Sequence, residues 1–146
     1  MTIRTFQGVV YPAQCDAMGH MNVQHYVGVF DQATWHLFAA CGYDSGWIEA
    51  RREGWADVRQ EIDYRQEVRA GELFVIDSAV RRVGGKSLTT WHRLSTARGV
   101  SAEMLAVTVY FDLAARRARE LPDVVRVGAL ALLEPSPEDP AKVDRA

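Results

Sequence analysis

Residues 16–41 read DAMGHMNVQHYVGVFDQATWHLFAAC, and this stretch decides the fold class. After Gln24, apolar residues recur three or four positions apart, which is the spacing of one helical face. The residues on this face are Tyr26, Phe30, Ala33, Leu37 and Cys41. Because Val29 and Phe38 widen the apolar stripe to more than half of the girth, we expect other elements to surround this helix.

Both ends of the predicted helix carry residues that suit helix termini. Asn22 can cap the N-terminus with its side-chain oxygen. Gly42 suits the position after the last turn because glycine tolerates a left-handed backbone. The spacing therefore predicts a helix over residues 24–41. Residues 5–11 read as a strand that ends at Pro12.

Four further strands are predicted downstream. In residues 56–68 apolar and charged side chains alternate, which indicates a strand with one face toward water. Its apolar face is expected to consist of Ala56, Val58, Ile62, Tyr64 and Val68. Three more strands, joined by turns at Gly84-Gly85 and Arg98-Gly99, are expected at residues 73–83, 86–96 and 102–113. Short connections imply antiparallel neighbours, and a helix segregated from a run of strands implies an α+β domain.

Composition limits the architecture and the partners. The chain has 146 residues, 48% hydrophobic and 25% charged, which is typical of one globular domain. We place that domain at residues 1–133, ending in a short helix or an extension, and expect the proline-rich stretch 134–146 to be disordered. A net charge of −2 gives no case for nucleic acid or a membrane surface. Because the sequence shows neither a bilayer-spanning apolar run nor a signal-peptide pattern, we expect a cytoplasmic protein.

Asp16 supplies a carboxylate shortly before the predicted start of the helix. This residue lies on a loop that contains Gly19 and leads into the helix. Helix N-termini present unpaired backbone N–H groups and the positive end of the helix dipole. A carboxylate beside such an end can act as base or nucleophile while the N–H groups hold a developing oxyanion, which is acyl-transfer chemistry. An ordinary loop and cap would have the same spacing, so the residues alone leave both interpretations open.

Four motifs occur in order along the chain: CDAMGHMN (residues 15–22) with Tyr26, IDY (62–64) before Gly71-Glu72, GKS (85–87), and VYFD (109–112) before Leu121-Pro122. Together they resemble the acyl-CoA thioesterases of the hot-dog fold, which include the 4-hydroxybenzoyl-CoA thioesterases. The chain departs from that pattern at Val23, where many relatives have a second asparagine. The resemblance implies a long central helix wrapped by a five-stranded antiparallel sheet, in homodimers or homotetramers whose active sites lie between subunits.

The resemblance also implies hydrolysis of an acyl-CoA thioester, with Asp16 as the catalytic carboxylate. Asp16 would attack the thioester carbonyl or deprotonate a water that does, and the sequence does not choose between the two. The N–H of Val23 is the first candidate to hold the oxyanion, with Gly19 and His20 as supporting donors. His20 either positions the thioester or water, or holds the loop. The remaining candidates at the helix start are Asn22, as cap, and Tyr26, as core or pocket wall.

Two other groups of residues are candidates for substrate binding. Cations and a hydroxyl around the Gly84-Gly85 turn suit the phosphates of CoA, although a solvated hairpin would look the same. These residues are Arg81, Arg82, Lys86 and Ser87. Tryptophan suits an aromatic acyl group or a quaternary ammonium, although simple core filling also explains it. The tryptophans in question are Trp47, Trp55 and Trp91.

No metal site is expected, because His25, His36 and His92 fall at no familiar ligand spacing. No cofactor is expected beyond the coenzyme A of the substrate. Two alternatives stay open: a hot-dog dehydratase or hydratase acting on acyl thioesters, and a non-catalytic module that binds acyl-CoA. The acyl group is also open, with aromatic, short aliphatic and betaine-like groups all possible.

Overall fold

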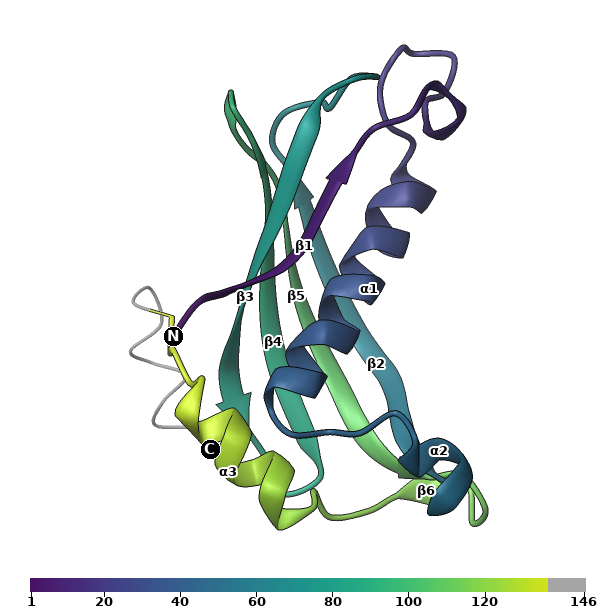
Figure 1. The fold of residues 1–146 in the computed structure, drawn as a ribbon, viewed down its shortest axis with the longest axis vertical. Coiled ribbons are helices and arrows are strands. Elements are labelled where there is room, and N and C mark those ends of the chain that lie inside the picture. The colour runs from purple at the N-terminus through teal and green to yellow at the C-terminus, as the bar shows by residue number, and fades with distance from the viewer. Residues whose placement is uncertain (137–146) are drawn as a thin grey trace.

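The computed structural model describes residues 1–136, in which a long helix lies across a curved antiparallel sheet (Figure 1). The helices are η1 (Pro12–Gln14), α1 (Val23–Ala40), α2 (Trp47–Ala50) and α3 (Asp123–Ala131). The strands are β1 (Ile3–Val9), β2 (Glu53–Tyr64), β3 (Leu73–Val83), β4 (Ser87–Thr96), β5 (Gly99–Asp112) and β6 (Arg117–Ala118). The five long strands follow the order β1-β3-β4-β5-β2, and the two-residue β6 pairs with β5. This arrangement confirms the predicted α+β class and its central helix.

The apolar stripe of α1 packs into the sheet as its spacing predicts. The buried residues of the helix are Tyr26, Val29, Phe30, Ala33, Thr34, Leu37 and Phe38. Asn22 caps the helix, since its side-chain oxygen accepts a hydrogen bond from the Gln24 N–H at 3.1 Å. Gly42 adopts φ +100°, the left-handed conformation expected after a last turn. The cap at Asn22 therefore fixes the N-terminus of α1, so that catalytic groups can be held in place beside it.

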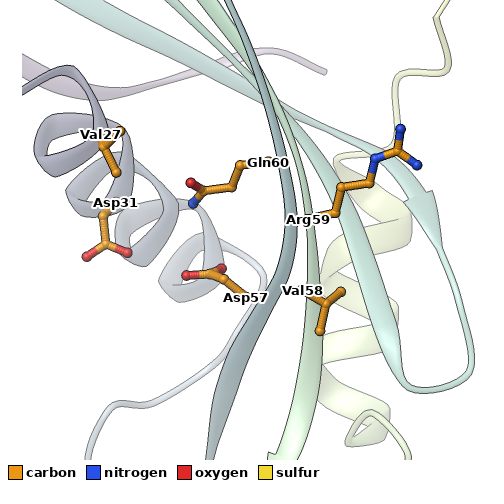
Figure 2. Close-up of a pocket in the computed structure, with 6 residues that line it drawn as sticks. All are labelled: Val27, Asp31, Asp57, Val58, Arg59 and Gln60. Carbon is orange, nitrogen blue, oxygen red and sulfur yellow. The ribbon is translucent and has the colours of Figure 1, made fainter. Parts of the chain in front are cut away.

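The predicted apolar face of the second strand is wrong at its first half. The pairing of β2 with β5 shifts register between Asp57 and Arg59. Such a β-bulge adds one residue and reverses which side chains face the helix. Asp57 and Gln60 consequently point toward α1, whereas Val58 and Arg59 point away (Figure 2), and Val58 is 60% exposed. Beyond the bulge the prediction holds at Tyr64, whose ring lies 5.1 Å from that of Tyr26 on α1.

A buried hydrogen-bond network joins α1 to three strands of the sheet around His92. Thr5 and Thr34 donate their hydroxyl hydrogens to main-chain oxygens at 3.2 and 2.8 Å. The Ser78 hydroxyl lies 2.7 Å from Oγ1 of Thr5 and 2.6 Å from Nδ1 of His92. Nε2 of His92 lies 3.0 Å from the Thr90 hydroxyl and 3.2 Å from the Thr34 hydroxyl on α1. Burial lowers the pKa of His92 to about 3, so the imidazole at the centre of this network is neutral at pH 7.

The sequence allows either a short helix or an extension at residues 123–133, and the structure shows a helix there, α3. Its Val125 and Ala129 are buried, and a Cβ at Gly128 would lie 1.9 Å from the main-chain oxygen of Cys41. After α3, the Glu134 N–H donates to the Val80 oxygen at 2.8 Å. Most of the predicted disordered tail, 137–146, lies outside the described residues. Within residues 1–136, no helix combines the length and apolarity needed to cross a membrane.

Candidate active site

Asp16 lies in the loop between η1 and α1, where short-range hydrogen bonds orient its carboxylate. The Asn22 side-chain amide donates to Oδ2 at 3.0 Å, and the Met18 N–H donates to Oδ1 at 2.9 Å. The hydrogen bond from Asn22 is the largest cause of a lowered Asp16 pKa, so the group is ionised at neutral pH. Its side chain keeps 17% of its surface exposed, which leaves a substrate access to it.

His20 lies between two carboxylates. Its Nε2 is 3.8 Å from Oδ1 of Asp16, and its Nδ1 is 3.0 Å from Oε2 of Glu67. The structure therefore brings together the predicted Asp16, His20 and Asn22, and adds Glu67, which sequence reasoning missed. The histidine is held by its partner on the segment that follows β2, and not by its own loop alone.

Two backbone N–H groups beside Asp16 are available to a ligand, and a third is not. Among the described residues, the N–H groups of Val23 and His20 have no hydrogen-bond acceptor. The N–H of Gly19 donates to the main-chain oxygen of Asp16 at 3.0 Å. Gly19 also adopts φ +81°, which explains glycine in this turn. Gly19 shapes the loop in this conformation, and Val23 and His20 keep their predicted capacity as donors.

The predicted coenzyme A cluster surrounds the turn between β3 and β4, which lies at the other end of the molecule from the loop between β1 and α1 (Figure 1). The Asp16 loop follows β1, whose Val9 pairs with Leu73 at the start of β3. The Gly84-Gly85 turn follows Val83 at the opposite end of that strand. At about 3.3 Å per residue, β3 separates the two places by roughly 35 Å.

The four residues of that cluster differ in whether their side chains already have partners within the protein. Arg81 donates to the main-chain oxygen of Glu134, and its guanidinium lies 4.5 Å from the Trp91 ring centroid. Arg82 and Lys86 are exposed and form no ion pair within the described part of the chain, and Ser87 is half-buried. Only Arg82 and Lys86 therefore present free charges to a phosphate.

The candidate tryptophans fall into three different environments. Trp55 stacks on Phe38 of α1 with ring centroids 4.1 Å apart. Trp47 packs edge-on against Tyr43 at 5.5 Å, at the same end of the molecule. Trp91 packs between Arg81 and Arg93 at 4.5 and 5.2 Å. The first two contribute to the helix side of the sheet, whereas Trp91 contacts the arginine side chains instead of the α1 core.

A groove runs between α1 and the edge strand β2 (Figure 2). Val27 and Asp31 line it from the helix, and Asp57 and Gln60 line it from the strand. Toward α2 it continues over Trp35, Phe38 and Trp55. Burial first, and then the charge of Asp57, raises the pKa of Asp31. Neither carboxylate has an ion-pair partner among residues 1–136.

Metal ligation has no evident place in this arrangement. Among the residues that the structure describes, no group of three or more His, Cys, Asp or Glu is arranged to hold a metal ion. The chemistry available at Asp16 is that of a carboxylate, an imidazole and free backbone N–H groups.

The sequence matches the family model of the thioesterase-like superfamily over residues 10–128. The chain therefore belongs to the thioesterase-like superfamily, and it is a thioester hydrolase. No curated protein matches the chain.

Solved structures are similar to it over nearly their whole length. Staphylococcus aureus SAV2348, in complex with CoA, aligns with TM-score 0.85 and 14% identity over 98% of this chain and 93% of that one. YbaW, a probable thioesterase from Escherichia coli, aligns with TM-score 0.74 and 24% identity over 92% and 99%. Slr0204, a 1,4-dihydroxy-2-naphthoyl-CoA thioesterase from Synechocystis, aligns with TM-score 0.79 and 16% identity over 92% and 100%. These likenesses establish the hot-dog fold.

Proposed function

We propose that the protein hydrolyses an acyl-CoA thioester to a free acid and CoA, with Asp16 as the catalytic carboxylate. The observation that carries this proposal is an ionised, accessible Asp16 beside the unpaired N–H of Val23 at the start of α1. Asp16 either attacks the carbonyl carbon or takes a proton from the water that attacks it. Both routes place negative charge on the carbonyl oxygen, which an N–H at the positive end of a helix stabilises.

The reaction needs no strong acid to finish. The carbon–sulfur bond breaks with its electrons on sulfur, and a thiolate is a good leaving group that takes up a proton from water. Hydrolysis at Asp16 therefore requires a carboxylate, an oxyanion donor and access for water, all of which this end of the molecule offers.

We place the acyl group in the groove between α1 and β2. Its aromatic walls, Trp35, Phe38 and Trp55, suit an apolar or cationic acyl group. They lie toward α2 and away from Asp16 of the same chain, so the groove that serves one Asp16 would be that of a second copy. The carboxylates of Asp31 and Asp57, which have no cationic partner among residues 1–136, repel an acyl group that carries its own carboxylate. Neutral and cationic acyl-CoAs are therefore the expected substrates, and acyl groups ending in a carboxylate are not.

We further propose that a second copy of the chain completes the site by pairing along β2. This edge strand has no partner strand on its outer side within residues 1–136. Large apolar side chains are exposed along it and on the adjacent face of α1, namely Val27, Trp35, Val58 and Tyr64. Twofold antiparallel pairing sets the Glu53 end of one β2 beside the Tyr64 end of the other. Trp47 of one copy would then lie toward Asp16 of the other.

The catalytic proposal is tested by release of free thiol from a panel of neutral, cationic and carboxylate-bearing acyl-CoAs. Asp16→Asn and Asp16→Ala should lose turnover with every substrate that the wild type hydrolyses, while still binding acyl-CoA. Near-normal hydrolysis in either variant would remove Asp16 from the mechanism. Because dehydration or hydration releases no thiol, the same assay separates hydrolysis from that alternative.

The pairing proposal is tested by cross-linking. Val58 lies near the middle of β2, so in a twofold pair its two copies are close together. Val58→Cys should give a covalent dimer under mild oxidation. Val124→Cys on α3 is the matched control, because Val124 is 54% exposed against 60% for Val58. A monomeric mass in sedimentation, or equal cross-linking of both variants, would contradict the pairing.

A further inference from the structure

We propose that Glu67 is a positioning residue for this reaction: it holds the imidazole of His20 with Nδ1–H toward itself and Nε2 toward Asp16. This inference rests on the proposed function of Asp16. Glu67 lies outside the Asp16 loop, on the segment between β2 and β3, and its Oε2 is 3.0 Å from Nδ1 of His20.

The protonation of the two groups follows from their partners. Hydrogen bonds, first from His20 and then from Arg69, lower the pKa of Glu67, so it is a carboxylate at neutral pH. An ionised carboxylate only accepts hydrogen bonds, so Nδ1 of His20 carries the hydrogen. Nε2, on the opposite side of the ring, faces Asp16 at 3.8 Å, and it bears the lone pair in the Nδ1–H tautomer.

Glu67 is itself fixed from several sides. Arg69 donates from Nε and Nη2 to Oε1 of Glu67 at 3.1 and 3.0 Å. Arg98 donates to the main-chain oxygen of Glu67 at 2.8 Å, and to both carboxylate oxygens of Glu72. The Met21 N–H donates to the Val68 oxygen at 2.8 Å, which ties this segment to the Asp16 loop. The position of Glu67 is therefore built into the fold.

The geometry gives this orientation a chemical use. A distance of 3.8 Å is too long for a direct hydrogen bond between Nε2 and Oδ1. It allows one water to donate a hydrogen to each of them, which holds the water oxygen for attack. In hydrolysis the water oxygen bonds to the acyl carbon, the carbon–sulfur bond breaks, and one water proton ends on the CoA sulfur. Asp16 takes that proton from the water and releases it through solvent, while Nε2 accepts the other hydrogen of the water and so fixes the direction of attack.

Glu67→Gln removes the charge of Glu67 and keeps its size. General acid–base groups are commonly worth 10²–10⁴-fold in rate, and an intact but misoriented imidazole loses part of that. We expect kcat for thiol release to fall about tenfold and KM to change less than about twofold. Nitrogen-15 NMR of the histidine rings should show His20 losing its Nδ1–H tautomer in favour of Nε2–H.

Two comparisons separate positioning from loop support. Glu72→Gln weakens the contact between Arg98 and Glu72, which supports the same segment, without touching His20, so it should keep the wild-type tautomer and lose much less kcat than Glu67→Gln. In a His20→Ala background, Glu67→Gln should cause no further loss, because its effect passes through the imidazole. An equal loss in Glu72→Gln, a full additional loss without His20, or an unchanged tautomer in Glu67→Gln would overturn the proposal. The tautomer is measured without turnover, so absence of thiol release by the wild type would count against the proposed function alone.

Discussion

Replacing Val23 by proline removes one backbone N–H and leaves the start of the helix intact. Val23 is the first residue of α1, a position that proline favours because its φ is already helical. The preceding Asn22 has φ −71° and ψ 147°, the extended conformation that a residue before proline prefers. The Val23 side chain is 56% exposed, so its replacement removes little buried surface. We expect Val23→Pro to fold with close to wild-type stability.

The expected effect on the rate is large. One oxyanion donor is worth about 3 kcal/mol in the barrier, and each 1.4 kcal/mol is roughly a factor of ten. Removing the Val23 N–H should therefore lower kcat for thiol release by about 10²-fold. Val23→Ala, which keeps the N–H and loses the same side chain, is the matched control and should keep the wild-type kcat.

The proline ring also fills space at the helix start, so its bulk needs a separate measurement. Binding of an acyl-CoA analogue with CH₂ in place of the thioester sulfur reports whether the ground state still fits. We expect its affinity to change far less than kcat. An unchanged kcat in Val23→Pro would refute the donor role, and an equal loss of analogue affinity would assign the effect to the ring.

Two further outcomes concern stability. Burial lowers the pKa of His92 to about 3 from 6.5, so below pH 6.5 the unfolded chain binds a proton that the native chain does not. His92 alone should lower the free energy of unfolding by up to about 1.4 kcal/mol per pH unit between these values, so urea titrations should find a smaller slope in His92→Leu than in the exposed control His36→Leu. Gly128→Ala should lower the free energy of unfolding by about 1–3 kcal/mol, because its Cβ would lie 1.9 Å from the Cys41 oxygen. Gly28 lies in α1, and a Cβ there would meet no atom within 4 Å outside the backbone of the helix, so Gly28→Ala should not destabilise the fold in the same urea titrations.

The sequence predicts the helix and the strands well where one spacing of apolar residues repeats along the whole segment. The stripe through Tyr26 and Leu37 places α1 within one residue of its observed bounds, 23–40, and the strand at 73–83 is matched at both ends. The faces of β2 could not be predicted, because a bulge at Val58 reverses them without altering the composition. Asp57 therefore reads as solvent-facing in the sequence and lines the groove in the structure.

The candidate site also has a part that the sequence predicts and a part that it does not. Asp16, His20 and Asn22 are close in the sequence, so the loop that joins them can be recognised from the order of residues alone. Glu67 is separated from His20 by 47 positions, and no local pattern links a carboxylate after an edge strand to a histidine before a helix. Only the pairing of strands and the contact between the two loops brings them together.

The length of β2 explains why candidate residues at the α2 end, such as Trp47, cannot lie beside Asp16 of the same chain. β2 extends from Glu53, beside α2 and Trp47, to Tyr64, beside the start of α1 (Figure 1). Any residue set drawn from both ends is therefore split in a single copy. In the pair proposed above, a twofold axis near the middle of this strand would reverse its ends, so that what one copy lacks beside Asp16 would be supplied by the far end of the other. Such an axis would make two equal sites, and we expect a variant that blocks pairing to abolish both while leaving each Asp16 loop folded.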